Sequence, residues 1–139
     1  EKFPEAARYA ERNIKRHGTD NVTLICGDVL NGAANDKEYE LIVSNPPYVP
    51  KNEMETVSPE VHYEPETALF GGEDGLMFYR RLAHEVYRHL KPGGYALFEV
   101  GDGQAAEVLR LMSENAMCAA SGTVKDLPGV ERVVWIRSR

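Results

Sequence analysis

Glu40-Leu41-Ile42-Val43-Ser44-Asn45-Pro46-Pro47-Tyr48 begins as an unbroken apolar and β-favouring run and ends in an asparagine, two prolines and a tyrosine. Residues 40–44 predict a β-strand that is buried on both faces. Pro46 ends this strand, because it lacks an N–H group and excludes the α region for Asn45. The fixed φ angles of Pro46 and Pro47 make the turn that follows stiff.

The turn presents two hydrogen-bond acceptors to one small space. They are the side-chain carbonyl of Asn45 and the backbone carbonyl of Pro46, and neither proline can donate a competing N–H. Two such acceptors suit a planar NH2 group, and the flat ring of Tyr48 can lie against a planar amide or base. The pattern favours methylation of an amide or an exocyclic amine, since the acceptors would align a poorly nucleophilic nitrogen with an electrophile. A Pro-rich turn without a ligand is the alternative interpretation.

Other segments alternate between strand and helix patterns. Residues 22–26 form a second buried-strand pattern that ends at Gly27-Asp28, and residues 95–100 form a third that ends at Gly101. Helices are expected from Pro4 to a stop at Gly18, from an Asp74 cap to the turn at residues 91–94, and over residues 104–115. The tail predicts an antiparallel pair of residues 123–125 with residues 130–136.

This order predicts an α/β fold with a mainly parallel, three-layered sheet and an antiparallel strand near its edge. Ligands of such sheets bind beyond the carboxyl ends of the strands. Asp28, Asn45 and Gly101 each follow a predicted strand directly. We therefore expect the candidate site at that end of the sheet.

Charge argues against a nucleic-acid surface. The 139 residues contain 42% hydrophobic residues, enough for one ordinary core, and carry a formal net charge of −6. Phosphate binding is usually accompanied by clustered Lys and Arg. Directly after the turn, residues 51–74 instead contain only Lys51 as a cation against a run of carboxylates. These are Glu53, Glu55, Glu60, Glu64, Glu66, Glu73 and Asp74.

Neither a metal site nor a disulfide framework is expected. The chain has two cysteines, Cys26 and Cys118, and its four histidines show no metal-ligand spacing with carboxylates. The sequence contains neither a signal-peptide pattern nor an apolar stretch long enough to cross a bilayer. These features predict a protein of the reducing cytoplasm with no membrane partner.

Together these motifs resemble those of the HemK-like family, the S-adenosylmethionine-dependent N5-glutamine methyltransferases that modify peptide chain release factors. The resemblance extends over nearly the whole chain. Its block between residues 59 and 80 separates this family from other methyltransferases that share only the four-residue turn. The matching segments are Asn45-Pro46-Pro47-Tyr48, Pro59-Glu60-Val61, Tyr63-Glu64-Pro65, Ala68-Leu69, Gly71-Gly72-Glu73-Asp74-Gly75-Leu76, Tyr79-Arg80, Leu90-Lys91-Pro92-Gly93-Gly94, Glu99-Val100-Gly101 with Gln104, and Asp126 through Arg132-Val133.

The resemblance implies a release factor as the protein substrate. Asn45 and the Pro46 carbonyl would hold the glutamine amide as catalytic groups, with Tyr48 packed beside it. Pro47 would complete the substrate-binding turn. Glu64 is a candidate for the substrate entrance, and a solvated charge is the alternative for this residue.

The resemblance also implies S-adenosylmethionine as cofactor. Asp28 would contact the adenine amino group, and Glu1 would hold the ribose hydroxyls. Val29 and Asn45 complete the expected cofactor contacts. A turn residue is the alternative for Asp28, and a solvated terminus is the alternative for Glu1.

One departure from the family affects the whole chain. The family has a glycine-rich cofactor loop after its first strand and a helical substrate-binding domain before it, and both would lie upstream of Glu1. We therefore expect a single partial catalytic domain over residues 1–139. Its Rossmann-like class I methyltransferase sheet would lack the first strand and most of the second. That leaves a hydrophobic edge on residues 40–44, which is a route to self-association, and it puts activity of the isolated chain in doubt.

Three alternatives stay open. Glu99-Val100-Gly101-Asp102-Gly103-Gln104-Ala105 also has the order of a cofactor loop, which would imply the permuted order of some DNA amino-methyltransferases. A methyltransferase that acts on an exocyclic amine of RNA or DNA would use the same turn. A non-catalytic, self-associating fragment is the third. The glycines of residues 71–75 form no phosphate loop, since no strand precedes them, and are expected at a hinge and helix entry.

Overall fold

The computed structural model describes residues 1–28, 37–58 and 60–139. They divide into two compact units, Glu1–Lys37 and Glu38–Arg139, and each is described by itself. The expected single domain over residues 1–139 stays a prediction.

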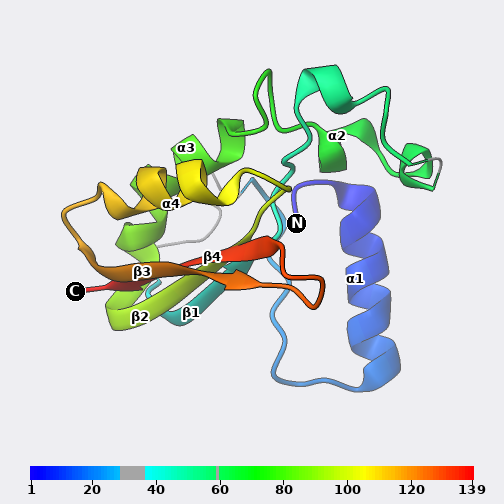
Figure 1. The fold of residues 1–139 in the computed structure, drawn as a ribbon. Helices are drawn as coiled ribbons and strands as arrows, with labels where there is room; N and C mark the ends of the chain where they lie inside the picture. Colours follow the sequence, from blue (N-terminus) through cyan, green and yellow to red (C-terminus); the bar gives the residue numbers. More distant parts are fainter. Residues whose placement is uncertain (29–36, 59) are drawn as a thin grey trace. The chain divides into compact units, whose positions relative to one another are not determined.

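The first unit contains the helix α1, Pro4–His17 (Figure 1). Pro4 begins the helix, where its missing N–H group costs no hydrogen bond, and Gly18 ends it in the left-handed region with φ of 61°. Ala7 is buried, and the basic residues of the last turn oppose the helix dipole favourably. The predicted helix is confirmed.

The strand predicted at residues 22–26 is wrong. These residues have no regular secondary structure, and Val22 is exposed. A strand requires a hydrogen-bonded neighbour, and in the described part of the first unit only Glu1 supplies one. Its amino group donates to the Ile25 carbonyl at 2.9 Å, and its carbonyl accepts from the Gly27 N–H at 2.8 Å. The apolar pattern indicated a strand, but one paired residue does not make a ladder.

The second unit is built on a four-stranded mixed sheet in the order β1-β2-β4-β3 (Figure 1). Its strands are β1 (Tyr39–Ser44), β2 (Leu90–Glu99), β3 (Cys118–Lys125) and β4 (Glu131–Ser138). β1 pairs with β2 in parallel, whereas β4 pairs antiparallel with both β2 and β3. The α/β class and the antiparallel tail pair are as predicted. The expectation of a mainly parallel sheet is not met among the described strands, since only β1 and β2 are parallel and residues 22–26 add no strand.

The turn predicted at residues 91–94 lies inside β2. The register steps from Tyr39 opposite Leu90 to Leu41 opposite Tyr95, so the residues between bulge out of the ladder. Gly93 supports this bulge with φ of 77°.

Short helices connect the strands. The α-helices of this unit are α2 (Glu66–Leu69), α3 (Met77–Glu85) and α4 (Ala105–Ser113), and the 3₁₀ turns are η2 (Lys51–Glu53), η3 (Val61–Tyr63) and η4 (Val86–His89). α3 starts later than the Asp74 cap predicts, because Gly75 with φ of 76° forms a turn first. Asp74 accepts the Leu76 N–H at 3.2 Å and pairs with Arg80, which holds the pKa of the Asp74 carboxyl at about 2.

One face of the sheet forms the core with α3 and α4, which lie on the same side of it (Figure 1). The fully buried apolar side chains of this core are Tyr79, Ala96, Phe98, Val100, Val108, Met112, Val134 and Ile136. Side chains of the opposite face stay accessible, with exposed fractions of 55% for Leu41, 69% for Val43 and 42% for Tyr95. The prediction that residues 40–44 are buried on both faces is therefore wrong. β1 is an edge strand of the described sheet, and α3 and α4 cover only one of its faces.

Candidate active site

The Asn-Pro-Pro-Tyr turn leaves the carboxyl end of β1 as predicted. Ser44, the last residue of β1, lies opposite Phe98 of the parallel strand β2, so both strands end at the same edge of the sheet. Asn45 is exposed there, Pro46 is buried, and Tyr48 is half-buried. Of the residues expected at this edge, Asn45 and Gly101 share it. Asp28 belongs to the other unit.

The carboxamide of Gln104 joins the turn to the end of β2. Its Nε2 donates to the Tyr48 carbonyl at 2.9 Å, and its Oε1 accepts from the Gly101 N–H at 3.0 Å. Gln104 is itself held by a backbone hydrogen bond to the Gly101 carbonyl at 3.2 Å, and it precedes α4 directly. Both halves of one side chain thus fix the position of the turn. Sequence reasoning gave Gln104 no role, because its partner Tyr48 is 56 residues away.

Glycines allow the backbone to approach Tyr48 closely. A Cβ atom at Gly71 would lie 2.8 Å from the Tyr48 Cα, and one at Gly101 would lie 3.1 Å from its Cδ2. At Gly75 a Cβ would collide with both the Tyr48 carbonyl oxygen and the Gln104 Nε2. The glycines expected at a hinge therefore form the wall against which Tyr48 packs.

The chain beyond the turn is fixed as well. Val49 forms a parallel bridge with Phe70, in which its N–H donates to the Leu69 carbonyl at 2.9 Å and its carbonyl accepts from the Gly71 N–H at 2.8 Å. The Lys51 N–H donates to the Gly72 carbonyl at 3.1 Å. Residues 49–51 are therefore tied to residues 69–72 by main-chain bonds, which limits the freedom of the turn.

Two acceptors of the turn receive no hydrogen bond from the part of the chain that the structure describes. Among the described residues, no hydrogen bond reaches the Asn45 carboxamide or the Pro46 carbonyl. The Tyr79 hydroxyl donates to the Glu99 carbonyl at 2.6 Å, and burial together with the nearby Tyr48 phenol raises the pKa of Tyr79. Tyr79 therefore stays a neutral donor. The Asn45 side-chain carbonyl and the Pro46 backbone carbonyl are the two oxygen acceptors that remain for a ligand.

Two of the expected cofactor residues lie together in the first unit. The hydrogen bonds between Glu1 and residues 25 and 27 have the pattern of a parallel pair, which brings Glu1 beside Cys26. Glu1 Oε1 accepts the Phe3 N–H at 2.7 Å, and Asp28 pairs with Lys2 at 3.2 Å. Val29 lies outside the described residues. The Glu1 and Asp28 carboxylates thus lie at the ends of two chain segments that are adjacent to each other.

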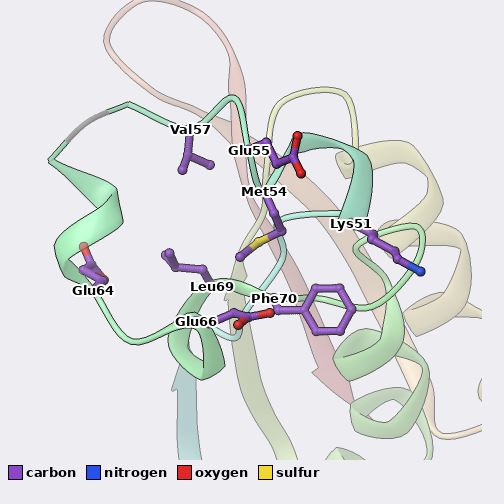
Figure 2. A pocket seen from close by; sticks show the side chains of 8 residues that line it. All are labelled: Lys51, Met54, Glu55, Val57, Glu64, Glu66, Leu69 and Phe70. Carbon is purple, nitrogen blue, oxygen red and sulfur yellow. The ribbon is translucent and has the colours of Figure 1, made fainter.

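Glu64 lines a pocket in the second unit whose lining comes from residues 51–57 and 64–70 (Figure 2). The residue is exposed, and it has no ion pair with a described residue. In the described ranges, no group of three or more His, Cys, Asp and Glu residues could hold a metal ion. No helix in those ranges is long and apolar enough to cross a membrane.

The chain is similar in sequence to several proteins that have the same name. No protein-family model matches it. It is 44% identical over 135 residues to the release factor glutamine methyltransferase of Geobacter sulfurreducens, covering 96% of this chain and 46% of that protein. To the protein of the same name from Fusobacterium nucleatum it is 39% identical over 131 residues, covering 94% of this chain and 37% of that protein. The chain is a homologue of the release factor glutamine methyltransferases. It spans less than half the length of these two relatives.

Solved structures agree with this relationship. The protein-(glutamine-N5) methyltransferase (release factor-specific) from Alicyclobacillus acidocaldarius is 30% identical, with a TM-score of 0.51 over 80% of this chain and 55% of that one. A methyltransferase from Pyrococcus furiosus, 23% identical, has a TM-score of 0.72 over 99% of this chain and 59% of that one, and shows the fold alone. The chain therefore has a partial Rossmann-like methyltransferase fold, like the release factor glutamine methyltransferases to which it is related.

Proposed function

We propose that this chain is the part of an S-adenosylmethionine-dependent methyltransferase that holds the side-chain amide of a glutamine in a peptide chain release factor. The observation that carries the proposal is the pair of acceptors at the end of β1, the Asn45 carboxamide and the Pro46 carbonyl, which no described residue engages. The sequence relationship to release factor glutamine methyltransferases supports the choice of substrate.

The acceptors would bind the two N–H groups of the glutamine amide, one each. An amide nitrogen is a weak nucleophile because its lone pair is delocalised, so its orientation decides the rate. Acceptors that follow the nitrogen as it becomes pyramidal stabilise the transition state more than the ground state. The positive charge that develops on nitrogen strengthens both hydrogen bonds. Tyr48 would pack against the flat amide, and Pro47 would keep the turn rigid.

Carboxylates of the first unit fit an adenosine group. Asp28 would accept from the adenine amino group and Glu1 from the ribose hydroxyls. The Asp28 and Glu1 carboxylates accept hydrogen bonds, which the adenine amino group and the ribose hydroxyls can donate. One Glu1 carboxylate oxygen is left for this, since Oε1 accepts the Phe3 N–H. When bound, S-adenosylmethionine would supply the electrophilic methyl group.

Methyl transfer to different acceptors tests the proposal. The complete protein is incubated with S-adenosylmethionine that carries a labelled methyl group, together with release factor, ribosomal RNA or duplex DNA. Mass spectrometry of the digested release factor should find the label on one glutamine amide. Label on nucleic acid alone would favour the amine methyltransferase instead. Label on neither substrate would refute both.

A second candidate rests on a different observation. Strand β1 is an edge of the described sheet, and its Leu41 and Val43 side chains are exposed. An exposed apolar edge strand can pair with a second chain, so self-association is the function that this edge favours.

A further inference from the structure

A pocket of about 530 Å³ lies in the segment that follows the Asn-Pro-Pro-Tyr turn (Figure 2). This volume is in the usual range of sites for small molecules and protruding side chains. Both apolar and charged side chains line it. The apolar ones are Met54, Val57, Leu69 and Phe70, and the charged ones are Lys51, Glu55, Glu64 and Glu66.

The charge of this pocket is negative. The only cation of the lining, the Lys51 ammonium group, donates to Glu73 outside the pocket at 2.8 Å, so its charge is already compensated. Glu55, Glu64 and Glu66 are exposed and have no ion pair with any residue of the described ranges. A carboxylate, phosphate or nucleic-acid backbone would therefore be repelled here.

Main-chain hydrogen bonds connect the pocket to the Asn-Pro-Pro-Tyr turn. Leu69 and Phe70 form part of its wall. Phe70 is the bridge partner of Val49, the residue directly after Tyr48, and the Leu69 carbonyl accepts the Val49 N–H at 2.9 Å. This part of the wall is tied to the turn, because the Val49 N–H and carbonyl are both used in the pairing. A group bound in the pocket would thus be held at a fixed position relative to Asn45.

We propose that the pocket binds an arginine side chain of the protein substrate, close in sequence to the glutamine that is methylated. The inference rests on the proposed function. Arginine combines an apolar stem, which would lie against Met54 and Leu69, with a planar cation that can bond two carboxylates such as Glu64 and Glu66. Lysine fits less well, since its ammonium group is more strongly hydrated and cannot form bidentate bonds.

Peptide binding tests this proposal without requiring catalysis. Fluorescent peptides contain one glutamine and one arginine at successive positions on either side of it, and each has a partner in which neutral citrulline replaces the arginine. Fluorescence anisotropy measures their affinity for the complete protein. At one or a few positions, the arginine peptide should bind about 10-fold more tightly than its citrulline partner.

Matched variants locate the effect. The double variant Glu64→Gln/Glu66→Gln should remove the preference for arginine, whereas Glu53→Gln/Glu60→Gln changes the net charge equally in the same acidic segment but outside the lining and should retain it. Equal affinity for arginine and citrulline peptides at every position, or equal losses in the two double variants, would overturn the proposal.

Mass spectrometry of the same peptides separates this proposal from the proposed function. Arginine-dependent binding without methylation would leave the pocket assignment in place and contradict the methyltransferase. Methylation with equal KM for arginine and citrulline peptides would contradict the pocket assignment and leave the proposed methyltransferase function in place.

Discussion

Asn45 is exposed at the end of β1, although the next residue, Pro46, is buried. The strand therefore ends with a buried anchor and a polar side chain that no described residue engages. A carboxamide that served only to end the strand would be expected to bond its own backbone, as Asn residues do in turns. Its free state is the feature that distinguishes a ligand-binding turn from a Pro-rich exit of a sheet.

Replacement of Asn45 by alanine tests the role of this side chain. In the complete protein, Asn45→Ala should lower kcat about 100-fold, the usual effect of removing one preorganised hydrogen bond to a reacting group. The dissociation constant for S-adenosylmethionine should change far less, because the lost contact is with the amide. Kinetics with release factor and calorimetric titration of the cofactor measure the two quantities. Asn52→Ala, which changes an exposed asparagine in η2, is the control. Unchanged kcat in Asn45→Ala would remove the mechanism.

Gln104 acts on this site through the turn and is a positioning residue. Gln104→Glu keeps the acceptor for the Gly101 N–H but replaces the donor to the Tyr48 carbonyl by a second acceptor. We expect kcat to fall about 10-fold or more with little change in the KM for release factor, since a displaced turn misaligns the amide. Gln104→Leu removes both bonds and should also lower stability, by about 1–3 kcal/mol. Equal kcat in Gln104→Glu and the wild type would show that the bond to Tyr48 has only a structural role.

At the scale of elements, local patterns predicted α1, β1 and the antiparallel pair of β3 and β4. Each has signals within its own sequence, such as Pro4 and Gly18 around α1. The strand expected at residues 22–26 failed, because a strand also depends on a neighbour that the pattern does not contain. The contacts of the site were missed for a similar reason. Gln104 and the glycines at positions 71 and 75 contact Tyr48 across long sequence separations, and no local pattern records such contacts.

Alanine substitutions at two glycines can separate the effect of the contact with Tyr48 from the effect of backbone strain. Gly75 and Gly103 both have φ of 76°, so alanine is strained at either position by about 1 kcal/mol. A Cβ at Gly75 would collide with the Tyr48 carbonyl oxygen, whereas a Cβ at Gly103 meets nothing within 4 Å. We therefore expect Gly75→Ala to lower the free energy of unfolding by about 2 kcal/mol more than Gly103→Ala, and to reduce methylation strongly. Urea unfolding of both variants measures the difference. Equal losses would mean that the turn adapts to a side chain at position 75.

At the scale of the whole molecule, the fold class could be predicted from the alternation of patterns, and the Asn-Pro-Pro-Tyr turn indicated the methyltransferases. Burial could not be predicted, because it depends on which elements cover each face of the sheet. The apolar run of β1 is typical of a central strand, yet α3 and α4 cover only one face of the described sheet, and β1 lies at its edge. The outcome is an apolar strand that has an accessible face and lies at the edge of the described sheet.

The position of β1 at the edge of the sheet leads to a prediction for the chain of residues 1–139. Its net charge of −6 opposes association, so pairing through β1 should strengthen as salt screens the repulsion. Sedimentation velocity at increasing protein concentration should detect association, and Val43→Lys should weaken it about 10-fold or more, because a lysine on an edge strand disfavours pairing. Leu127→Lys places the same charge at an exposed apolar residue between β3 and β4, and it should leave association unchanged. Equal weakening by both variants would point to a general charge effect. A monomer at every concentration and salt would show that the β1 edge does not drive pairing.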